Sequence, residues 1–233
     1  EDEGYYKTKI NKELTNKLIE IFRDGKFHYR FKNNNNNEKI NLKKNLTLDK
    51  IIENSNFQGI SHLTIDFDQN EKNDLNKFAQ SEFFINLAKS YLGNNKLVIN
   101  THCYISNPIK TSIDIQKENA QFYHYDCDYK KFFKVFIYLT DVNHLNGPHK
   151  FVSKSHKKRN FLFLNSTRLD DKIITENFGD KVITFVGEKG TIIFEDTFGL
   201  HKGDIPKINS RVMIVLEYGI SPRILYDGYE IEI

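Results

Sequence analysis

The run Phe132-Phe-Lys-Val-Phe-Ile-Tyr-Leu-Thr-Asp-Val142 has the composition of a buried β-strand, and Gln121-Phe-Tyr-His-Tyr-Asp-Cys-Asp128 stands just before it. β-Branched and aromatic residues fill the run, as they do in strands of packed sheets. Turns such as Gly147-Pro148 between short strands are typical of antiparallel architecture. Further strand-like runs cover Leu97–Ile105, Lys181–Val186, Thr191–Phe194 and Arg211–Gly219. We therefore expect a mainly β fold with peripheral helices (α+β), built on a double-stranded β-helix, or cupin-like jelly roll.

The first third of the chain indicates helices. Asn11 is a suitable N-cap for a helix that ends near Gly25, and Ser81 is suitable for one that ends near Gly93. A shorter helix is expected from Thr47, and residues 58–67 alternate like a strand. The asparagine tract Asn33–Asn37 has no means of burying surface and is expected to be a loop.

The length of 233 residues suits one domain. We expect residues 1–233 to form it, with a helical N-terminal elaboration over 1–95, the jelly-roll core over 96–220 and a C-terminal tail over 221–233. The sequence has no internal repeat. It also has no Gly-rich phosphate loop after a strand, which disfavours nucleotide-binding folds.

Composition limits the partners and the compartment. The 34 basic and 31 acidic residues give a net charge of +3, which argues against nucleic acid and slightly favours an anionic small molecule as substrate. Two cysteines are too few for a disulfide framework. There is no apolar run of about 18 residues, and the first residues lack a signal-peptide pattern. We therefore expect a cytoplasmic protein without a membrane partner.

His124 and Asp126 suggest a metal site. Alternating residues of a strand face the same side, so this pair can present an imidazole nitrogen and a carboxylate oxygen together. Two histidines and one carboxylate, with the remaining positions open, form the site of non-haem Fe(II) oxygenases. Asp128 lies on the same alternating face and is an alternative carboxylate. The third ligand would come from the histidines farther along the chain: His144, His149, His156 or His201.

The order of motifs resembles the phytanoyl-CoA dioxygenase family of Fe(II)/2-oxoglutarate-dependent enzymes. An H-x-D is followed by the strand ending in Thr140-Asp-Val142, then by Asn146-Gly-Pro148, a Ser-His-Lys turn and a distal His and Arg, over residues 97–219. One departure is Ser153-Lys-Ser-His156, where the family usually has Pro-Gly-Ser-His. The substrate-side turn is therefore expected to differ in shape.

The resemblance implies Fe(II), 2-oxoglutarate and O₂ as cofactor and co-substrates. Residue by residue, it makes His124, Asp126 and His201 the iron ligands and Arg211 the partner of the distal 2-oxoglutarate carboxylate. A planar guanidinium suits a carboxylate better than the point charge of lysine. Because Arg211 follows His201 by ten positions, we expect it to open a strand that returns antiparallel beside the histidine.

Four further residues are weaker candidates for contact with 2-oxoglutarate. Asn100 and Tyr104 share a face of the strand that precedes the H-x-D segment, and Tyr138 and Thr140 share a face of the strand that follows it. Each of them also suits a place in the core or on the sheet surface.

The resemblance implies hydroxylation of an unactivated C–H bond of a small molecule or small-molecule moiety, with release of succinate and CO₂. Related halogenases lack the ligand carboxylate, so Asp126 favours hydroxylation over halogenation. Desaturation, epimerisation and ring closure would use the same site. The alternative is a non-catalytic jelly-roll module that binds a glycan or another ligand, with structural histidines or a non-redox metal.

Overall fold

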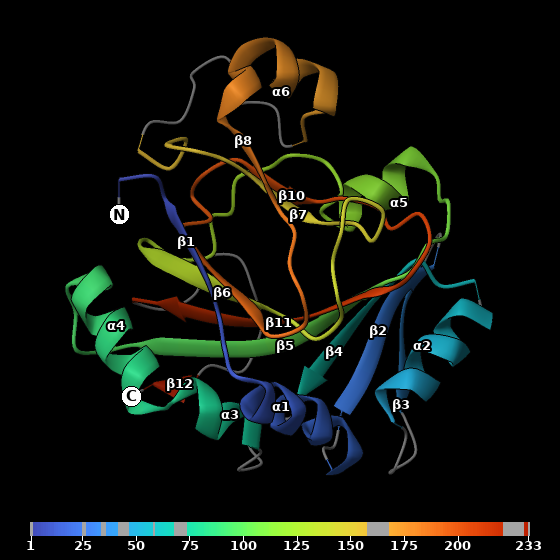
Figure 1. The fold of residues 1–233 in the computed structure, drawn as a ribbon, viewed down its shortest axis with the longest axis horizontal. Helices are drawn as coiled ribbons and strands as arrows, with labels where there is room; N and C mark the ends of the chain where they lie inside the picture. Colours follow the sequence, from blue (N-terminus) through green and yellow to red (C-terminus); the bar gives the residue numbers. More distant parts are fainter. Residues whose placement is uncertain are drawn as a thin grey trace.

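Two antiparallel sheets face each other in the computed structural model, which describes residues 2–24, 27–33, 36–41, 47–57, 59–67, 74–157, 168–220 and 231–232 (Figure 1). The large sheet has the strand order β1-β9-β6-β11-β5-β4-β2-β3, with β12 paired to β5. The small sheet has the order β10-β7-β8. This two-sheet architecture confirms the expected mainly β jelly-roll class.

The strands of the large sheet are β1 (Tyr5–Lys9), β2 (Phe27–Asn33), β3 (Asn36–Asn41), β4 (His62–Phe67), β5 (Val98–Ser106), β6 (Phe132–Tyr138), β9 (Thr191–Glu195), β11 (Arg211–Gly219) and β12 (Ile231–Glu232). Those of the small sheet are β7 (His149–Val152), β8 (Val182–Phe185) and β10 (His201–Gly203). The helices are α1 (Lys12–Asp24), α2 (Leu48–Phe57), α3 (Asp74–Ala79), α4 (Glu82–Leu92), α5 (Ile113–Glu118), α6 (Asp171–Phe178) and the short 3-10 helix η2 (Gly179–Lys181).

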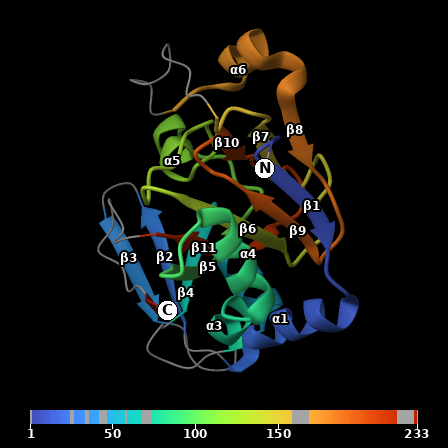
Figure 2. The same ribbon diagram turned by 90° about the vertical axis from the view of Figure 1, so that its left-hand side faces the viewer.

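Helices cover the outer face of the large sheet, and the small sheet covers its inner face. Figures 1 and 2 show α1, α3 and α4 on the side of the large sheet away from β7, β8 and β10. Strand β11 is buried along its whole length because both of its faces are covered. Its outer residues, such as Leu216, pack with the helices, and its inner residues, such as Val215, pack between the sheets. Apolar burial on both faces is the main contribution that holds the layers together.

The N-terminal third contains four strands as well as helices, whereas the sequence pattern indicated helices and one strand, over residues 58–67. Strands β1 to β4 all belong to the large sheet. The loop expected over the asparagine tract is wrong in part, since Asn33 ends β2 and Asn36 and Asn37 begin β3; the two residues between them lie outside the described part of the chain. Ladder hydrogen bonds use backbone groups, so a strand can form without apolar side chains.

The C-terminal tail expected over 221–233 also contributes to the sheet. Ile231 and Glu232 form β12 and pair with Ile99 and Val98 of β5. Residues 221–230 lie outside the described residues. β4 pairs with residues 102–106 of β5, so the short strand β12 continues that side of β5 at Val98 and Ile99, opposite β11.

The helix boundaries follow the capping residues. The Asn11 side chain accepts a 2.8 Å hydrogen bond from the Leu14 N–H at the start of α1. Ser81 is the N-cap of α4 but makes no side-chain capping hydrogen bond, and Gly93 ends that helix in the left-handed conformation. Within the described residues, the helices are all too short or too polar to cross a lipid bilayer.

Candidate metal centre

Backbone pairing brings the two segments of the centre together. The His124 N–H donates to the His201 carbonyl at 3.0 Å, and the His201 N–H donates back to the His124 carbonyl at 3.1 Å. Two residues on, the Asp126 N–H donates to the Thr197 carbonyl at 3.0 Å. The sequence pattern predicts a regular strand for the H-x-D segment, but the segment forms only an isolated β-bridge. The reciprocal bonds nevertheless place both histidines opposite each other, as in an antiparallel ladder.

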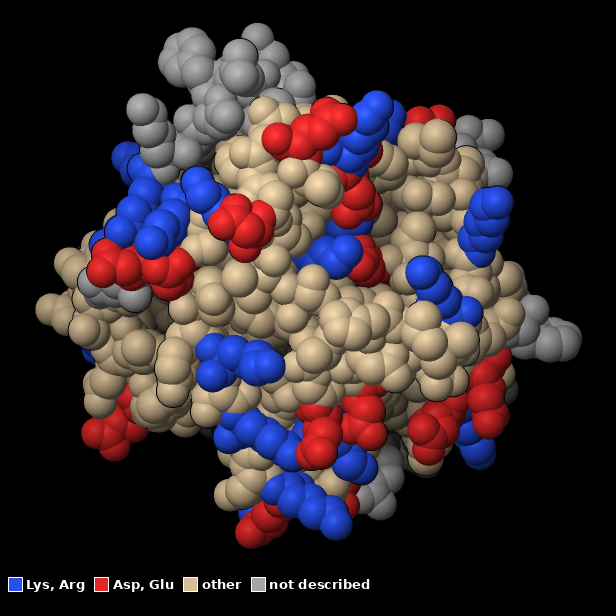
Figure 3. Space-filling view, turned by 45° about the horizontal axis from the view of Figure 1, so that its top comes forward, with Lys and Arg blue, Asp and Glu red and all other residues tan. Residues whose placement is uncertain are grey.

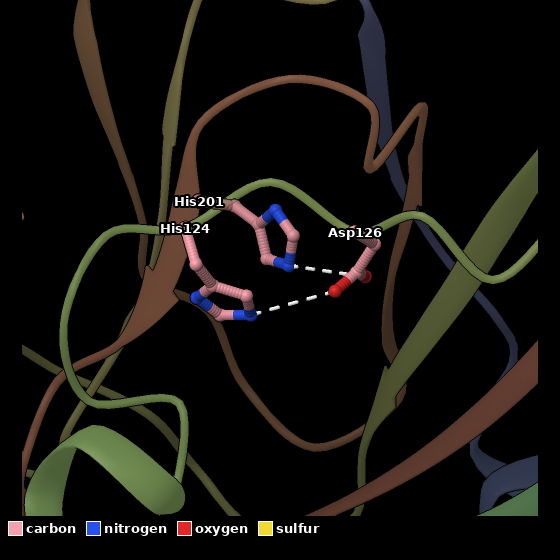
Figure 4. A group of neighbouring side chains, drawn as sticks. All are labelled: His124, Asp126 and His201. Carbon is pink, nitrogen blue, oxygen red and sulfur yellow. Dashed lines mark ion pairs between the residues drawn. The ribbon is translucent and has the colours of Figure 1, made fainter. Parts of the chain in front are cut away.

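Three side chains converge on one point (Figure 4). Asp126 Oδ1 lies 3.5 Å from His124 Nε2, and Asp126 Oδ2 lies 3.3 Å from His201 Nε2. Within the described part of the chain, these three residues are the one group of histidine, cysteine and carboxylate side chains whose ligand atoms lie within 4.8 Å of one another. Both histidines are buried and Asp126 is half-buried. The arrangement is that of two imidazoles and one carboxylate on one face of a metal.

Backbone carbonyls set the orientation of both rings. His124 Nδ1 lies 2.9 Å from the Phe122 carbonyl oxygen, and His201 Nδ1 lies 2.9 Å from that of Gly199. A carbonyl only accepts, so each Nδ1 carries the hydrogen. In the neutral ring Nε2 then holds a lone pair, and it is Nε2 that faces Asp126. Histidines that bind a metal through one ring nitrogen usually donate the hydrogen of the other ring nitrogen to a carbonyl or carboxylate, as both histidines do here.

Burial and neighbouring charges separate the titration of the three groups. Burial, followed by the charge of His201, lowers the pKa of His124 to about 3. Burial also opposes the charged form of Asp126, but Lys134 and the two histidines hold the pKa of this carboxyl well below its ordinary value. Burial also opposes the charged form of His201, but Asp126, Glu195 and the Gly199 carbonyl together outweigh it and raise the pKa of this ring. A metal ion binds the neutral imidazole and the ionised carboxylate, so the pKa shifts of His124 and Asp126 favour metal binding and that of His201 opposes it.

The other histidines and the other carboxylate do not reach this point. His149 Nε2 lies 3.0 Å from Glu195 Oε2, and His144 is exposed in a loop. His156 packs against the backbone at Gly4. Asp128 accepts a 2.8 Å hydrogen bond from Lys134. The structure therefore brings Asp126 and His201 together with His124 and leaves the four alternatives outside the cluster.

Three ionisable groups beside the centre were missed by sequence reasoning: the buried Glu195 and Glu217, and Lys134, whose side chain is 11% exposed. Lys134 Nζ lies 2.7 Å from Asp126 Oδ2 and 3.2 Å from Glu217 Oε1. Burial raises the pKa of Glu195 to about 8, and burial with the charges of His201 and Arg211 lowers that of His149. The signal for these residues was present in the sequence, since each is a charge at an inward-facing position of an otherwise apolar strand.

Arg211 is buried between the sheets without a carboxylate partner. It donates to the Gly147 carbonyl oxygen and to Ser106 Oγ, the latter at 3.2 Å. Its Nε makes no hydrogen bond, and no carboxylate among the described residues lies within ion-pair distance. Burial lowers its pKa. A buried guanidinium without a counter-ion is costly, so this position suits an anionic ligand that completes the pairing.

Arg211 does not lie antiparallel beside His201, which corrects the expected arrangement. His201 begins β10 in the small sheet and Arg211 begins β11 in the large sheet. Residues 204–210 cross from one sheet to the other. The two side chains belong to one interior because the sheets face each other, and Arg211 Nη2 reaches Gly203 so closely that a Cβ there would lie 2.7 Å from it.

The weaker candidates are distributed over this interior. Tyr104 lies between two rings, 4.6 Å from that of His102 and 5.3 Å from that of His62. The Tyr138 hydroxyl donates to the Phe185 carbonyl at 2.9 Å, so it ties the two sheets together. Asn100 and Thr140 also bond to protein groups, with Asn100 Nδ2 3.5 Å from Tyr129 Oη and Thr140 Oγ1 accepting from the Val212 N–H at 3.1 Å.

The outer surface carries mixed charge. Figure 3 shows acidic and basic side chains beside one another on the face that it draws. The described residues include such pairs, for example Lys77 with Asp74 at 2.9 Å and Lys157 with Asp2 at 2.6 Å. Exposed pairs of this kind contribute little to stability. Any preference for an anion is therefore carried by Arg211 in the interior rather than by these paired surface charges.

Several solved structures share the fold of this chain, although no family model matches the sequence and no curated protein is significantly similar to it. HygX from Streptomyces hygroscopicus, with nickel and 2-oxoglutarate bound, is 10% identical with a TM-score of 0.59, over 98% of this chain and 86% of HygX. EctD from S. alaskensis, with 2-oxoglutarate and 5-hydroxyectoine, is 12% identical with a TM-score of 0.55, over 93% and 72%. The non-haem α-ketoglutarate-dependent epimerase SnoN from nogalamycin biosynthesis is 13% identical with a TM-score of 0.56, over 93% and 76%.

Proposed function

We propose that this protein is an Fe(II)- and 2-oxoglutarate-dependent oxygenase. The observation that carries the proposal is the convergence of His124, Asp126 and His201, with both rings oriented by backbone carbonyls so that Nε2 faces the carboxylate. Two imidazoles and one carboxylate leave open positions on a metal, as this class requires. The structural neighbours HygX and EctD, crystallised with 2-oxoglutarate, support the choice of co-substrate.

Arg211 is the proposed partner of the distal carboxylate of 2-oxoglutarate. The guanidinium is buried, lacks a carboxylate partner among the described residues and lies in the same interior as the triad. Its fork can donate two parallel hydrogen bonds to a carboxylate. Iron with 2-oxoglutarate and O₂ supplies the oxidising chemistry and releases succinate and CO₂. The three ligands hold the metal, and Arg211 orients the co-substrate.

Hydroxylation of an unactivated C–H bond of a small molecule is the reaction we favour. The carboxylate of Asp126 occupies the place that a halide needs in a halogenase. The epimerase SnoN shares the fold, so the fold does not distinguish hydroxylation from epimerisation. Analysis of the product tests the choice of hydroxylation. HygX with hygromycin B and EctD with 5-hydroxyectoine support a small-molecule substrate.

The first experiment is anaerobic addition of Fe(II) and then 2-oxoglutarate. The expected result is a weak charge-transfer absorption from the chelate, followed under air by succinate formation. His124→Ala and His201→Ala remove a ligand and should abolish both signals, whereas His144→Ala, at an exposed loop histidine, should leave both unchanged. Arg211→Lys should weaken 2-oxoglutarate binding by about 10–100-fold with metal affinity retained.

The alternative class gives a different result. A non-catalytic jelly-roll module would bind a ligand such as a glycan with no absorption band and no succinate under any condition. Equal succinate release from wild type and His124→Ala would also contradict the proposal, because the proposed ligand would then have no role in turnover.

A further inference from the structure

A row of buried polar residues crosses the inner face of the large sheet beside the metal centre. The registers of four neighbouring strands place Glu195 opposite Lys134, Lys134 opposite Glu217, and Glu217 opposite Asn100. Residues directly opposite in adjacent strands lie on the same face. Glu195, Glu217 and Asn100 are buried, and the Lys134 side chain is 11% exposed. The row therefore puts one amine among carboxylates in the interior, where charges are rarely found.

Lys134 joins this row to the metal centre. Its Nζ donates to Asp126 Oδ2 at 2.7 Å and to Asp128 Oδ2 at 2.8 Å, and it lies 3.2 Å from Glu217 Oε1. The contacts with the two aspartates are hydrogen bonds and the contact with Glu217 is an ion pair, so the ammonium group lies among three carboxylates. Charge-assisted contacts of this length in a buried setting fix both partners. The Lys134 ammonium group thus binds Oδ2 of Asp126, the residue whose carboxylate faces the two histidines.

We propose that Lys134 is a positioning residue that occupies Oδ2 of Asp126 and so limits this carboxylate to a single metal-coordinating oxygen, Oδ1. The inference rests on the proposed function and goes beyond its ligand set. A carboxylate that used both oxygens would fill one of the positions that a chelating 2-oxoglutarate and O₂ require together. Lys134 keeps that position open without itself touching the metal.

The sign of the effect on metal binding distinguishes this role from simple support of the fold. Second-shell groups that accept from a ligand raise the basicity of that ligand, whereas Lys134 is a cation that donates to one. Its removal should therefore strengthen binding of a divalent metal alone and weaken 2-oxoglutarate binding, because the freed oxygen competes with the chelate. A merely structural role would weaken both.

The variant to test is Lys134→Met, which keeps the length of the stem and removes the amine. We expect Mn(II) or Co(II) to bind about tenfold more tightly than to wild type, measured by competition with a chelator. Affinity for 2-oxoglutarate and turnover should fall by about 10–100-fold. Lys134→Arg retains a cation and should recover part of the loss. Crystals of the Co(II)-loaded proteins should show one coordinating Asp126 oxygen in wild type and two in Lys134→Met.

Two controls keep the test decisive. Lys131→Met removes an exposed amine that donates to the Tyr91 and Leu92 carbonyls, and it should change neither affinity. If Lys134→Met does not fold, the double variant Lys134→Met with Glu217→Gln removes one buried charge of each sign and carries the same expectations. Thermal unfolding of each protein verifies that the folded state is compared.

Parallel weakening of metal and 2-oxoglutarate binding would overturn the inference, as would unchanged affinities or two coordinating Asp126 oxygens in wild type. The metal affinity and the Co(II) coordination do not depend on 2-oxoglutarate. A wild-type protein that binds metal through one Asp126 oxygen but gives no 2-oxoglutarate chelate would contradict the proposed function alone.

Discussion

At the scale of single residues, hydrogen-bonded protons determine what the centre can bind. His124 and His201 each direct Nε2 toward Asp126 because a carbonyl two residues earlier holds the Nδ1 hydrogen. The pKa of His124 is lowered to about 3 and that of His201 is raised, so the imidazolium form is favoured more at His201 than at His124. Burial is the largest effect on both rings, but at His201 it is outweighed by the combined effects of Asp126, Glu195 and the Gly199 carbonyl. At a pH below the raised pKa of His201, metal binding must therefore displace a proton from this ring.

Metal affinity should rise with pH. Below the raised pKa of His201 the imidazolium competes with the metal, so the affinity for Co(II) should increase about tenfold per pH unit. Above that pKa the affinity should level off, because no proton remains to be displaced. Calorimetry in buffers of different ionisation heat would count the released protons. A constant affinity and no proton release on both sides of pH 6.5 would show that His201 is already neutral in the metal-free protein.

At the scale of elements, the pairing of strands that are distant in the sequence determines the geometry of the site more than the local sequence pattern does. The strand-like runs were readable from composition, and β5, β6, β8, β9 and β11 all form where they were expected. The order of the H-x-D motif, the distal His and the distal Arg along the sequence predicted the candidate ligands and Arg211. The relation of β10 to β11 was not readable, because it depends on which sheet each strand joins. The register that places Lys134 and Glu217 beside Asp126 is likewise a long-range property.

Gly203→Ala tests the packing of β10 against β11. A Cβ at this position would lie 2.7 Å from Arg211 Nη2, so the guanidinium must move from its contacts with Gly147 and Ser106. We expect affinity for 2-oxoglutarate to fall about tenfold with metal affinity unchanged. Gly187→Ala is the matched control, since its Cβ would lie 2.3 Å from Thr191 Oγ1 instead. That variant should lose stability but not co-substrate affinity, and the reverse pattern would contradict the assignment of Arg211.

At the scale of the whole molecule, two sheets enclose an interior that is partly polar. The apolar core on the helix side of the large sheet is what the alternating strand pattern indicated. The N-terminal hairpin of β2 and β3 was missed because the asparagine tract carries no hydrophobic period. Between the sheets, His62, Tyr104, Ser106 and Arg211 share the inner face at one end. Such groups cost stability when they ionise without a partner.

Acidification should destabilise the metal-free protein, in part through His62. Burial, followed by the charge of Arg211, lowers the pKa of His62 from 6.5 to about 3. As pH falls through this window the unfolded chain binds a proton that the folded protein does not, so the free energy of unfolding decreases. His62→Asn should reduce the loss between about pH 7 and pH 4 by about 1–3 kcal/mol. Urea unfolding at each pH measures it, with His144→Asn as the exposed control; equal slopes for wild type and His62→Asn would refute the role.

The reciprocal backbone bonds between His124 and His201 have a consequence for metal selection. They fix the separation of the two histidine backbones, so the fold sets the positions from which both imidazoles reach the centre. A site whose ligand positions are set by the fold does not select between metal ions by changing its shape. The intrinsic affinities of nitrogen and oxygen ligands rise from iron toward nickel and copper. We expect the occupant to be decided by which ion the cell supplies, so protein purified on nickel resin should need stripping and reloading with ferrous ion before any assay.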